Sequence, residues 1–147
     1  MNRINLICLG VRDIKKSLAF YKNIGFHTYE KKDKPAVVFF DNQGTKLELY
    51  PLEELVRDID AENPPPLSLD GFGGITLACN LKSEAEVDAF MKRVKEHGGV
   101  IAKQPQKVFW GGYSGYFQDP DGYYWEVAYG PAWKFDDNNM LVIEEDH

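Results

Sequence analysis

The stretch that decides the fold is Gly115-Tyr116-Phe117-Gln118-Asp119-Pro120-Asp121-Gly122-Tyr123-Tyr124-Trp125-Glu126-Val127. Two runs rich in aromatic residues flank an Asp-Pro-Asp-Gly turn, in which proline presets φ at the first corner and glycine accepts the positive φ of the last. The pattern predicts a β-hairpin whose second arm carries a single acid, Glu126, in an apolar strand. A weaker copy of this arm is Thr45-Lys46-Leu47-Glu48-Leu49-Tyr50-Pro51, and we expect the two arms to surround a shared cavity.

The residues around the weaker copy predict one β-α-β-β-β unit over residues 3–59. Asp13 can cap its helix, whose apolar face repeats with helical spacing, and Gly25 can end it. Alternation and turn residues predict the strands, and an acidic segment after Pro51 predicts a short helix. The expected strands are Ile4–Val11, Phe26–Lys31, Ala36–Phe40 and Thr45–Tyr50.

The same order of elements follows in residues 72–130. Ser83-Glu84-Ala85-Glu86 is a capping box, in which the serine and the second glutamate each accept from a free amide at the helix start. Strands are expected over Gly73–Cys79 and Val100–Lys103, and another is expected to begin at Val108–Trp110. The hairpin supplies the last two strands. The single domain 1–147 thus contains two modules, a proline-rich linker over 60–71 and a tail over 131–147.

The composition excludes some functions. The formal net charge is −6, which argues against a surface that binds nucleic acid or an anionic membrane. The longest apolar run, Ala36–Phe40, is far too short to span a bilayer, and the N-terminus has no secretory pattern. Cys8 and Cys79 are expected to be buried free thiols in a reducing compartment. We therefore expect a cytoplasmic protein with no nucleic-acid or membrane partner.

Alternation along the strands separates a branched apolar face from a polar or small one. Glu48 is on the other face of its strand from Leu47 and Leu49, and Glu126 is on the same face as Tyr124. Cys8 and Thr76 lie on the small-residue faces of the two first strands. Such a face is often only the solvated side of an antiparallel sheet, but on a concave sheet it leaves room for a ligand.

Several motifs resemble the vicinal oxygen chelate (VOC) superfamily, which includes glyoxalase I, bleomycin-resistance and fosfomycin-resistance proteins and extradiol dioxygenases. The resemblance covers roughly residues 3–130. It implies an α+β fold in which two βαβββ modules form an open, cup-shaped mixed sheet, usually in a homodimer. The motifs are Val11-Arg12-Asp13, Ser17-Leu18-Ala19-Phe20-Tyr21, Ile24-Gly25-Phe26, Leu47-Glu48-Leu49, Asp119-Pro120-Asp121-Gly122 and Trp125-Glu126-Val127.

The resemblance also implies where metal ligands would lie. Glu48 and Glu126 match the two glutamates of glyoxalase-like members, whereas Leu6 and Gly74 replace the two histidines. A catalytic divalent site normally needs three protein ligands, and two carboxylates alone hold a hard cation weakly. We expect no cofactor, with a divalent metal held by other ligands as the alternative. The substitutes to consider are His27, His97 and His147, which are expected at the surface, at a helix end and in the tail.

A second candidate region is the aromatic, glycine-rich stretch over residues 108–116. Trp110 and Tyr113 could stack on a flat ligand or a cation, or they could close the end of the barrel or form a dimer contact. Trp133 and Phe135 are expected to anchor the tail.

These observations predict a protein that binds a small molecule in its cup without the usual metal. Its ligand-binding residues would be Trp110, Tyr113, Tyr124, Cys8 and Thr76, together with the two glutamates. The alternative is a glyoxalase-like lyase or isomerase, or another metal-dependent VOC enzyme, with Glu126 and Glu48 as catalytic acid–base groups. A third hypothesis is an interaction module whose cup is filled by side chains.

Overall fold

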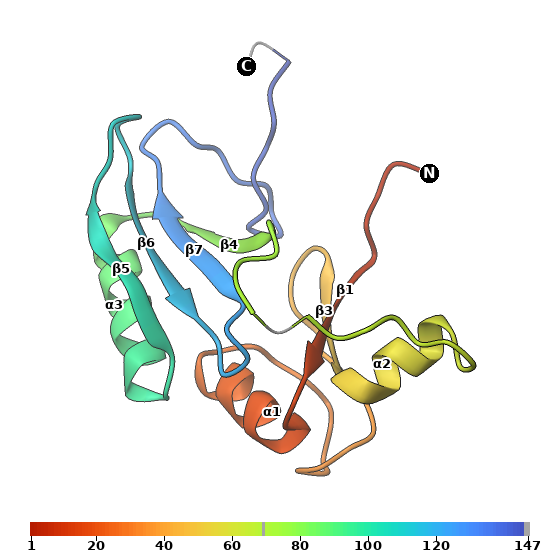
Figure 1. Cartoon of the computed structure of the whole chain (residues 1–147). Coiled ribbons are helices and arrows are strands. Elements are labelled where there is room, and N and C mark those ends of the chain that lie inside the picture. Colours follow the sequence, from red (N-terminus) through yellow and green to blue (C-terminus); the bar gives the residue numbers. More distant parts are fainter. Residues whose placement is uncertain (69, 146–147) are drawn as a thin grey trace. The chain divides into compact units, whose positions relative to one another are not determined.

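The computed structural model describes residues 1–68 and 70–145 (Figure 1). His147, in the predicted tail, therefore lies outside the described residues, as does residue 69 of the predicted linker. The chain divides into two compact units, Met1–Ile75 and Thr76–His147, each with its own sheet. The predicted α+β fold is confirmed, and each unit has a mixed sheet of its own.

The first unit contains a three-stranded sheet in the order β1-β3-β2. β1 is parallel to β3 and β2 is antiparallel to it, so that the sheet is mixed. The Asp13 carboxylate accepts from the Lys16 amide at 3.1 Å and caps α1, as predicted. The elements are β1 (Leu6–Val11), α1 (Ile14–Asn23), β2 (Val38–Phe39), β3 (Lys46–Pro51) and α2 (Leu52–Ile59).

Aromatic side chains form the centre of the first unit's core. Tyr21 of α1 is fully buried, and its ring meets those of Phe26 and Phe40 edge-to-face at 5.6 and 6.0 Å between centroids. Leu47 and Leu49 of β3 are buried as well, whereas Glu48 between them is half-buried. The predicted alternation of β3 is therefore confirmed.

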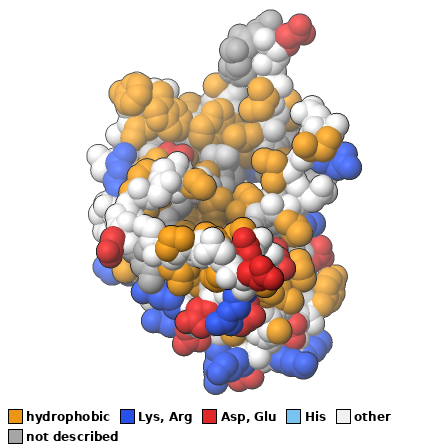
Figure 2. All heavy atoms as spheres, turned by 45° about the vertical axis from the view of Figure 1, so that its right-hand side comes forward, with side chains coloured by type: hydrophobic (Ala, Val, Ile, Leu, Met, Phe, Trp, Pro, Cys, Tyr) orange, Lys and Arg blue, Asp and Glu red, His pale blue; other side chains and the backbone are white. Residues whose placement is uncertain are grey.

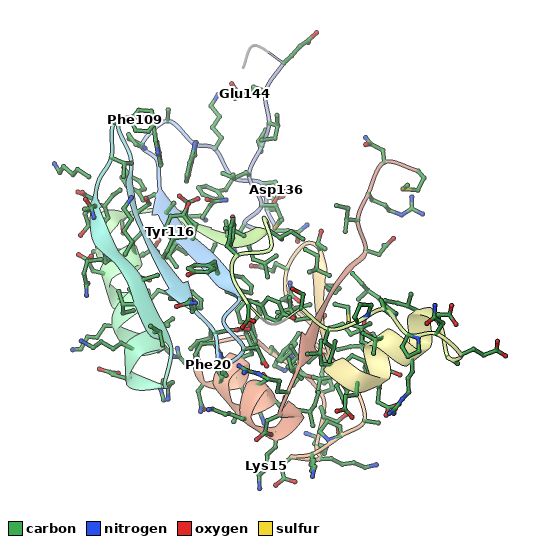
Figure 3. All side chains as sticks on the ribbon, viewed as in Figure 1. Lys15, Phe20, Phe109, Tyr116, Asp136 and Glu144 are labelled. Atoms are coloured by element: carbon green, nitrogen blue, oxygen red, sulfur yellow. The ribbon has the colours of Figure 1, made fainter. Side chains whose placement is uncertain are left out.

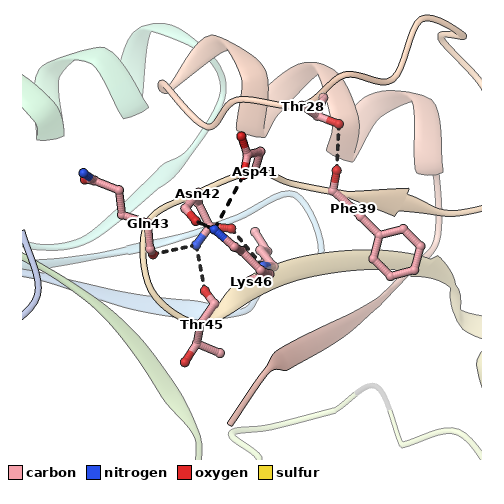
Figure 4. Close-up of polar contacts among 8 residues, drawn as sticks. Thr28, Phe39, Asp41, Asn42, Gln43, Thr45 and Lys46 are labelled. Atoms are coloured by element: carbon pink, nitrogen blue, oxygen red, sulfur yellow. Dashed lines mark hydrogen bonds and ion pairs between the residues drawn. The ribbon is translucent and has the colours of Figure 1, made fainter. Parts of the chain in front are cut away.

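The predicted strand over Phe26–Lys31 does not form, and the predicted strand over Ala36–Phe40 shortens to β2. The side-chain hydroxyl of Thr28 donates to the Phe39 carbonyl at 2.7 Å (Figure 4). The Asp41 amide donates to the His27 carbonyl at 2.7 Å. The Phe39 carbonyl thus accepts from a side-chain hydroxyl in place of a backbone amide, and the two segments do not form a regular β-ladder.

The turn between β2 and β3 is held by Asn42. Its side-chain amide donates to the carbonyls of Gln43 and Thr45, and its side-chain oxygen accepts from the Leu47 amide at 2.9 Å (Figure 4). The Lys46 ammonium donates to the Asn42 carbonyl and lies 3.6 Å from the Asp41 carboxylate. These bonds fix the start of β3 and hence the register of Glu48.

The second unit is a complete β-α-β-β-β module with a four-stranded sheet in the order β4-β7-β6-β5 (Figure 1). β4 is parallel to β7, and the other two pairs are antiparallel. α3 covers one face of the sheet and buries Val87, Met91 and Val94. The elements are β4 (Thr76–Leu81), α3 (Glu84–Glu96), β5 (Val100–Lys107), β6 (Tyr113–Gln118) and β7 (Tyr124–Tyr129).

The predicted hairpin and capping box are both present. Gly122 has φ +90° in the hairpin turn, and the buried Asp119 carboxylate accepts from the amides of Asp121 and Tyr123 at 2.9 Å each. The Ser83 hydroxyl accepts from the Glu86 amide at 3.1 Å, and the Glu86 carboxylate accepts from the Lys82 amide at 2.7 Å. The hairpin turn fixes the register of β6 against β7.

No strand begins at Val108–Trp110, contrary to the prediction. The Val108 amide donates to the Gly112 carbonyl and the Gly111 amide to the Val108 carbonyl, which closes a tight loop between β5 and β6. β5 instead extends to Lys107, and β6 begins at Tyr113. The loop forms because two glycines follow Trp110 and allow the chain to reverse.

The tail residues that the structure describes pack on the second unit. Trp133 stacks on Trp110 with 5.4 Å between ring centroids and 22° between planes. Phe135 lies 5.4 Å from the Lys82 ammonium, and that ammonium also donates to the Asn139 side chain at 2.7 Å. These contacts agree with the predicted role of Trp133 and Phe135 as anchors.

Hydrophobic side chains are spread over the surface that Figure 2 shows. Phe109, at the tip of the loop between β5 and β6, is fully exposed (Figure 3). Singly exposed hydrophobic residues are ordinary in soluble domains. Among the residues described, none of the three helices is long and apolar enough to cross a membrane.

Candidate functional site

The sheet of the second unit has one face under α3 and one polar face. Phe117, Trp125 and Val127 are buried on the α3 side, and the Phe117 ring lies 6.1 Å from that of Phe90 on the helix. The intervening residues of β6 and β7 point to the other face, because side chains alternate along a strand. That polar face carries Tyr116, Gln118, Tyr124, Glu126 and Thr76.

Glu126 lies near the centre of this polar face. β7 pairs with β4 on one side and β6 on the other, so Glu126 is in register with both Ala78 and Tyr116. Burial, followed by the charge of the neighbouring Glu126 carboxylate, raises the pKa of the Tyr116 phenol. The raised pKa keeps the phenol protonated at neutral pH, so Tyr116 can donate a hydrogen bond to Glu126. Figure 3 shows Tyr116 on β6.

Lys103 of β5 completes a row of polar side chains across three neighbouring strands. It pairs with Tyr116, and its ammonium lies 6.0 Å from the centre of the Tyr116 ring. A cation at that distance from a tyrosine ring is attracted by the ring's electrons. The row therefore places a cation, a phenol and a carboxylate side by side on one face.

The first unit presents a related pair on β1 and β3. Cys8 lies opposite Glu48 in the parallel ladder, as Ala78 lies opposite Glu126. Burial, followed by the charge of Glu48 and a hydrogen bond to it, raises the pKa of the Cys8 thiol to about 12. The raised pKa keeps the Cys8 thiol protonated and lowers its nucleophilicity at neutral pH. Burial alone raises the pKa of Cys79 to about 11.

Helix α2 limits the open area around Glu48. A Cβ on Gly10 would meet Leu52 Cδ1 at 2.4 Å and Leu55 Cδ2 at 3.1 Å. Gly10 shares its face of β1 with Cys8, so α2 packs directly on the small-residue face. The small residue there makes room for a helix, whereas the sequence had suggested room for a ligand.

The predicted ligand residues do not all share one face. Tyr124 and Thr76 are paired in the ladder and lie with Glu126, whereas Cys8 lies with Glu48 in the other unit. Tyr113 is an even number of residues from Phe117, on the α3 side, and its hydroxyl donates to the Asp88 carboxylate of α3 at 2.7 Å. That bond is the main reason why the pKa of Tyr113 is raised.

The Trp110 side chain packs against other residues of the second unit. It is 41% exposed, stacks on Trp133, and covers Gly112, where a Cβ would lie 1.9 Å from its ring. Trp133 covers Gly130 in the same way, at 2.7 Å. The glycines thus leave room for two indole rings, and a ligand role for Trp110 stays a prediction.

The donor set does not fit the metal site that the resemblance implies. Leu6 has no donor atom, and Gly74 has no side chain and adopts φ +88°, where a histidine would be strained. Thr76, which pairs with Tyr124 as Leu6 pairs with Lys46, offers only a hydroxyl. Within residues 1–68 and 70–145, no group of three His, Cys, Asp or Glu side chains could share a metal ion.

The two described histidines do not supply the missing ligands. His27 is exposed and packs its ring against Tyr29 at 4.8 Å between ring centroids, and the exposed His97 is the C-cap of α3.

Tyr116 and Lys103 are the residues of the polar face that the sequence analysis missed. The hairpin register could have placed Tyr116 opposite Glu126, because the turn fixes both arms.

The chain is similar to a known family and to solved structures. The sequence model of the Glyoxalase/Bleomycin resistance protein/Dioxygenase superfamily matches residues 3–127. A glyoxalase-related enzyme from Fulvimarina pelagi is 26% identical, with a TM-score of 0.85 over 97% of this chain and 99% of that one. A lactoylglutathione lyase from Agrobacterium tumefaciens is 25% identical, with a TM-score of 0.67 over 92% and 99%. No curated protein matched the chain.

Proposed function

Because the chain belongs to the glyoxalase/bleomycin resistance protein/dioxygenase superfamily, we propose that it binds a small molecule on the polar face of the second unit, without the family's usual metal. The ligand contacts Glu126, Tyr116 and Tyr124, with Thr76 at the edge of the same face. The observation that carries this proposal is the pairing of Glu126 with Tyr116 across the β6–β7 ladder, on the face opposite α3.

The physical argument rests on what this pair offers a ligand. The carboxylate has lone pairs left after it accepts from Tyr116, and the phenol oxygen can itself accept a hydrogen bond. Tyr124 and Tyr116 add aromatic surface on either side of the carboxylate. A cation or a hydrogen-bond donor of a small molecule is therefore favoured between the two tyrosines. None of these contacts needs a metal ion.

A second candidate function is a lyase or isomerase of glyoxalase type. The likeness to a lactoylglutathione lyase at 25% identity and the pairing of a phenol with a carboxylate in the β6–β7 ladder both favour it. In that case Glu126 would accept a proton next to a carbonyl and Tyr116 would donate one to the carbonyl oxygen. Glu48 would act in the same way at its own face, with Cys8 as its neighbour. Metal-dependent catalysis would need metal ligands from elsewhere, because Leu6 and Gly74 have no side chain that could bind a metal.

We further propose that the protein is a cytoplasmic homodimer. The resemblance to the VOC superfamily supports the dimer, and the two free cysteines fit a reducing compartment. Light scattering coupled to size-exclusion chromatography tests the dimer, which requires a mass twice that of the 16.8 kDa chain.

A thermal-shift screen of small metabolites tests the proposed function. The screen uses protein purified without chelator, whose content of first-row metals is measured first, and is repeated after dialysis against EDTA. Ligands of the proposed site raise the melting temperature of both samples. They fail to do so for Glu126→Gln and retain their effect on Glu96→Gln, a matched change of an exposed glutamate on α3. Ligands that raise the melting temperature of the undialysed, metal-containing sample alone would contradict the proposal.

A further inference from the structure

A β-bulge in β5 sets the direction of Lys103. Ile101 pairs with Phe117, and Lys103 pairs with Tyr116, so β5 advances two residues while β6 advances one. Without this irregularity Lys103 would share the α3 side with Ile101, because alternate residues of a strand point the same way. The bulge instead directs Lys103 to the polar face, where its ammonium meets the Tyr116 ring.

The packing of β6 allows this bulge. A Cβ on Gly115 would lie 2.8 Å from the Lys103 carbonyl oxygen and 3.0 Å from the Pro105 nitrogen. The bulged backbone therefore occupies the space that any larger residue at Gly115 would need. Bulges that redirect a side chain are frequent next to functional sites. The placement of Lys103 is thus a feature of the sheet's backbone, and not a chance orientation of a long side chain.

Lys103 and Glu126 are opposite charges on one face that do not neutralise each other. In the described part of the chain, none of the salt bridges includes either residue. Tyr116 lies between them in the ladder, paired with Lys103 on one side and with Glu126 on the other, and its ring is near the Lys103 ammonium. Neighbouring strands are about 5 Å apart, so β5 and β7 are separated by about 10 Å. One small molecule can span that distance.

We propose that the ligand of this face is zwitterionic, with an ammonium group that binds Glu126 between Tyr116 and Tyr124 and a carboxylate that binds Lys103. This proposal rests on the proposed function and names its ligand class. The carboxylate of Glu126 and the faces of two tyrosines attract an ammonium group, and the Lys103 ammonium donates to a carboxylate. The carbon chain between the two groups lies across the Tyr116 ring.

A series of three probes tests this class by NMR on isotope-labelled protein. The probes are 6-aminohexanoate, hexylammonium and hexanoate, which share a chain but carry both charges, the positive one or the negative one. The ring signals of Tyr116 and Tyr124 are followed in wild type, Lys103→Gln and Lys107→Gln. Lys107 is an exposed lysine of the same strand, paired with Tyr113, and is the matched control.

The expected result is that 6-aminohexanoate binds about tenfold more tightly than hexylammonium, since one charge-assisted hydrogen bond is added. Lys103→Gln removes this difference and leaves hexylammonium unaffected, whereas Lys107→Gln changes neither. Equal affinities in wild type, or a preference that survives Lys103→Gln, would overturn the zwitterionic class. The Glu126-dependent hits of the metabolite screen decide the proposed function separately. If such hits exist but carry no anionic group, the binding face stands and the zwitterionic class is wrong.

Discussion

Gly115 lies so close to the Lys103 carbonyl oxygen that a Cβ at this glycine would approach it to 2.8 Å. The contact joins two neighbouring strands at the bulge that turns Lys103 toward Tyr116. A methyl group added at Gly115 would therefore press on the backbone that directs Lys103. The relationship connects the packing under α3 with the polar face on the other side of the sheet.

Gly115→Ala should lower the free energy of unfolding by about 1–3 kcal/mol, the usual cost of an added methyl group that meets rigid backbone. Denaturant unfolding followed by circular dichroism measures this change. Gly73→Ala is the control, because a Cβ at Gly73 would meet nothing within 4 Å. A Gly115→Ala protein as stable as the wild type would show that the bulge is not held by this contact.

Glu126→Gln should lower the pKa of the Tyr116 phenol, because the carboxylate is one of the groups that raise it, after burial. A neutral amide no longer disfavours the phenolate by its charge. Titration of the tyrosine ring carbons by NMR follows each phenol separately. Tyr113 serves as an internal control, since its pKa is raised by Asp88 on α3. If Tyr116 titrates identically in both proteins, the proposed pair with Glu126 is wrong.

Glu48→Gln should increase the rate at which iodoacetamide alkylates Cys8. Glu48 contributes to the raised Cys8 pKa of about 12, and each unit of decrease gives about tenfold more thiolate at neutral pH. Mass spectrometry of a Cys79→Ser background measures the rate for Cys8 alone. In the matching Cys8→Ser background, the Cys79 rate should not respond to Glu48→Gln, because burial alone raises that pKa. An unchanged Cys8 rate would separate Cys8 from Glu48.

Trp110→Ala and Trp133→Ala should each destabilise the second unit, and their effects should not add. A stacked aromatic pair has a coupling energy of about 0.5–1.5 kcal/mol in a double-mutant cycle. Denaturant unfolding of both single variants and the double variant measures it. Additive losses would show that the stack of 5.4 Å contributes nothing of its own. Ligand stabilisation that disappears in Trp110→Ala would instead assign Trp110 to binding.

Much of the fold could be predicted from local sequence. Asp13, Ser83 and Gly122 each act through their nearest neighbours, as a helix cap or a turn residue, and the structure shows all of them in those roles. The prediction of a strand over Phe26–Lys31 was wrong, because the Phe39 carbonyl of β2 accepts its hydrogen bond from the Thr28 hydroxyl. Alternation reports which side chains share a face, but it does not report whether the neighbouring backbone will supply amides.

The candidate site was predictable only in part, for a similar reason. Glu126 and Tyr124 stand two apart in one strand, so their common face follows from alternation. Lys103 reaches that face through a bulge, which breaks the alternation that a sequence argument must assume. Tyr113 was assigned to the ligand by residue type, whereas its strand position sends it toward Asp88.

Metal-independent binding at the Glu126 face is the central claim, and one NMR experiment tests it most directly. EDTA-dialysed protein with labelled tyrosine rings is titrated with the metabolites that raise its melting temperature. The account predicts that the signals of Tyr116 and Tyr124 shift on binding, and that Glu126→Gln abolishes these shifts. Ligands that bind only after Zn²⁺ or Ni²⁺ is added back, or that leave both tyrosines unperturbed, would contradict it.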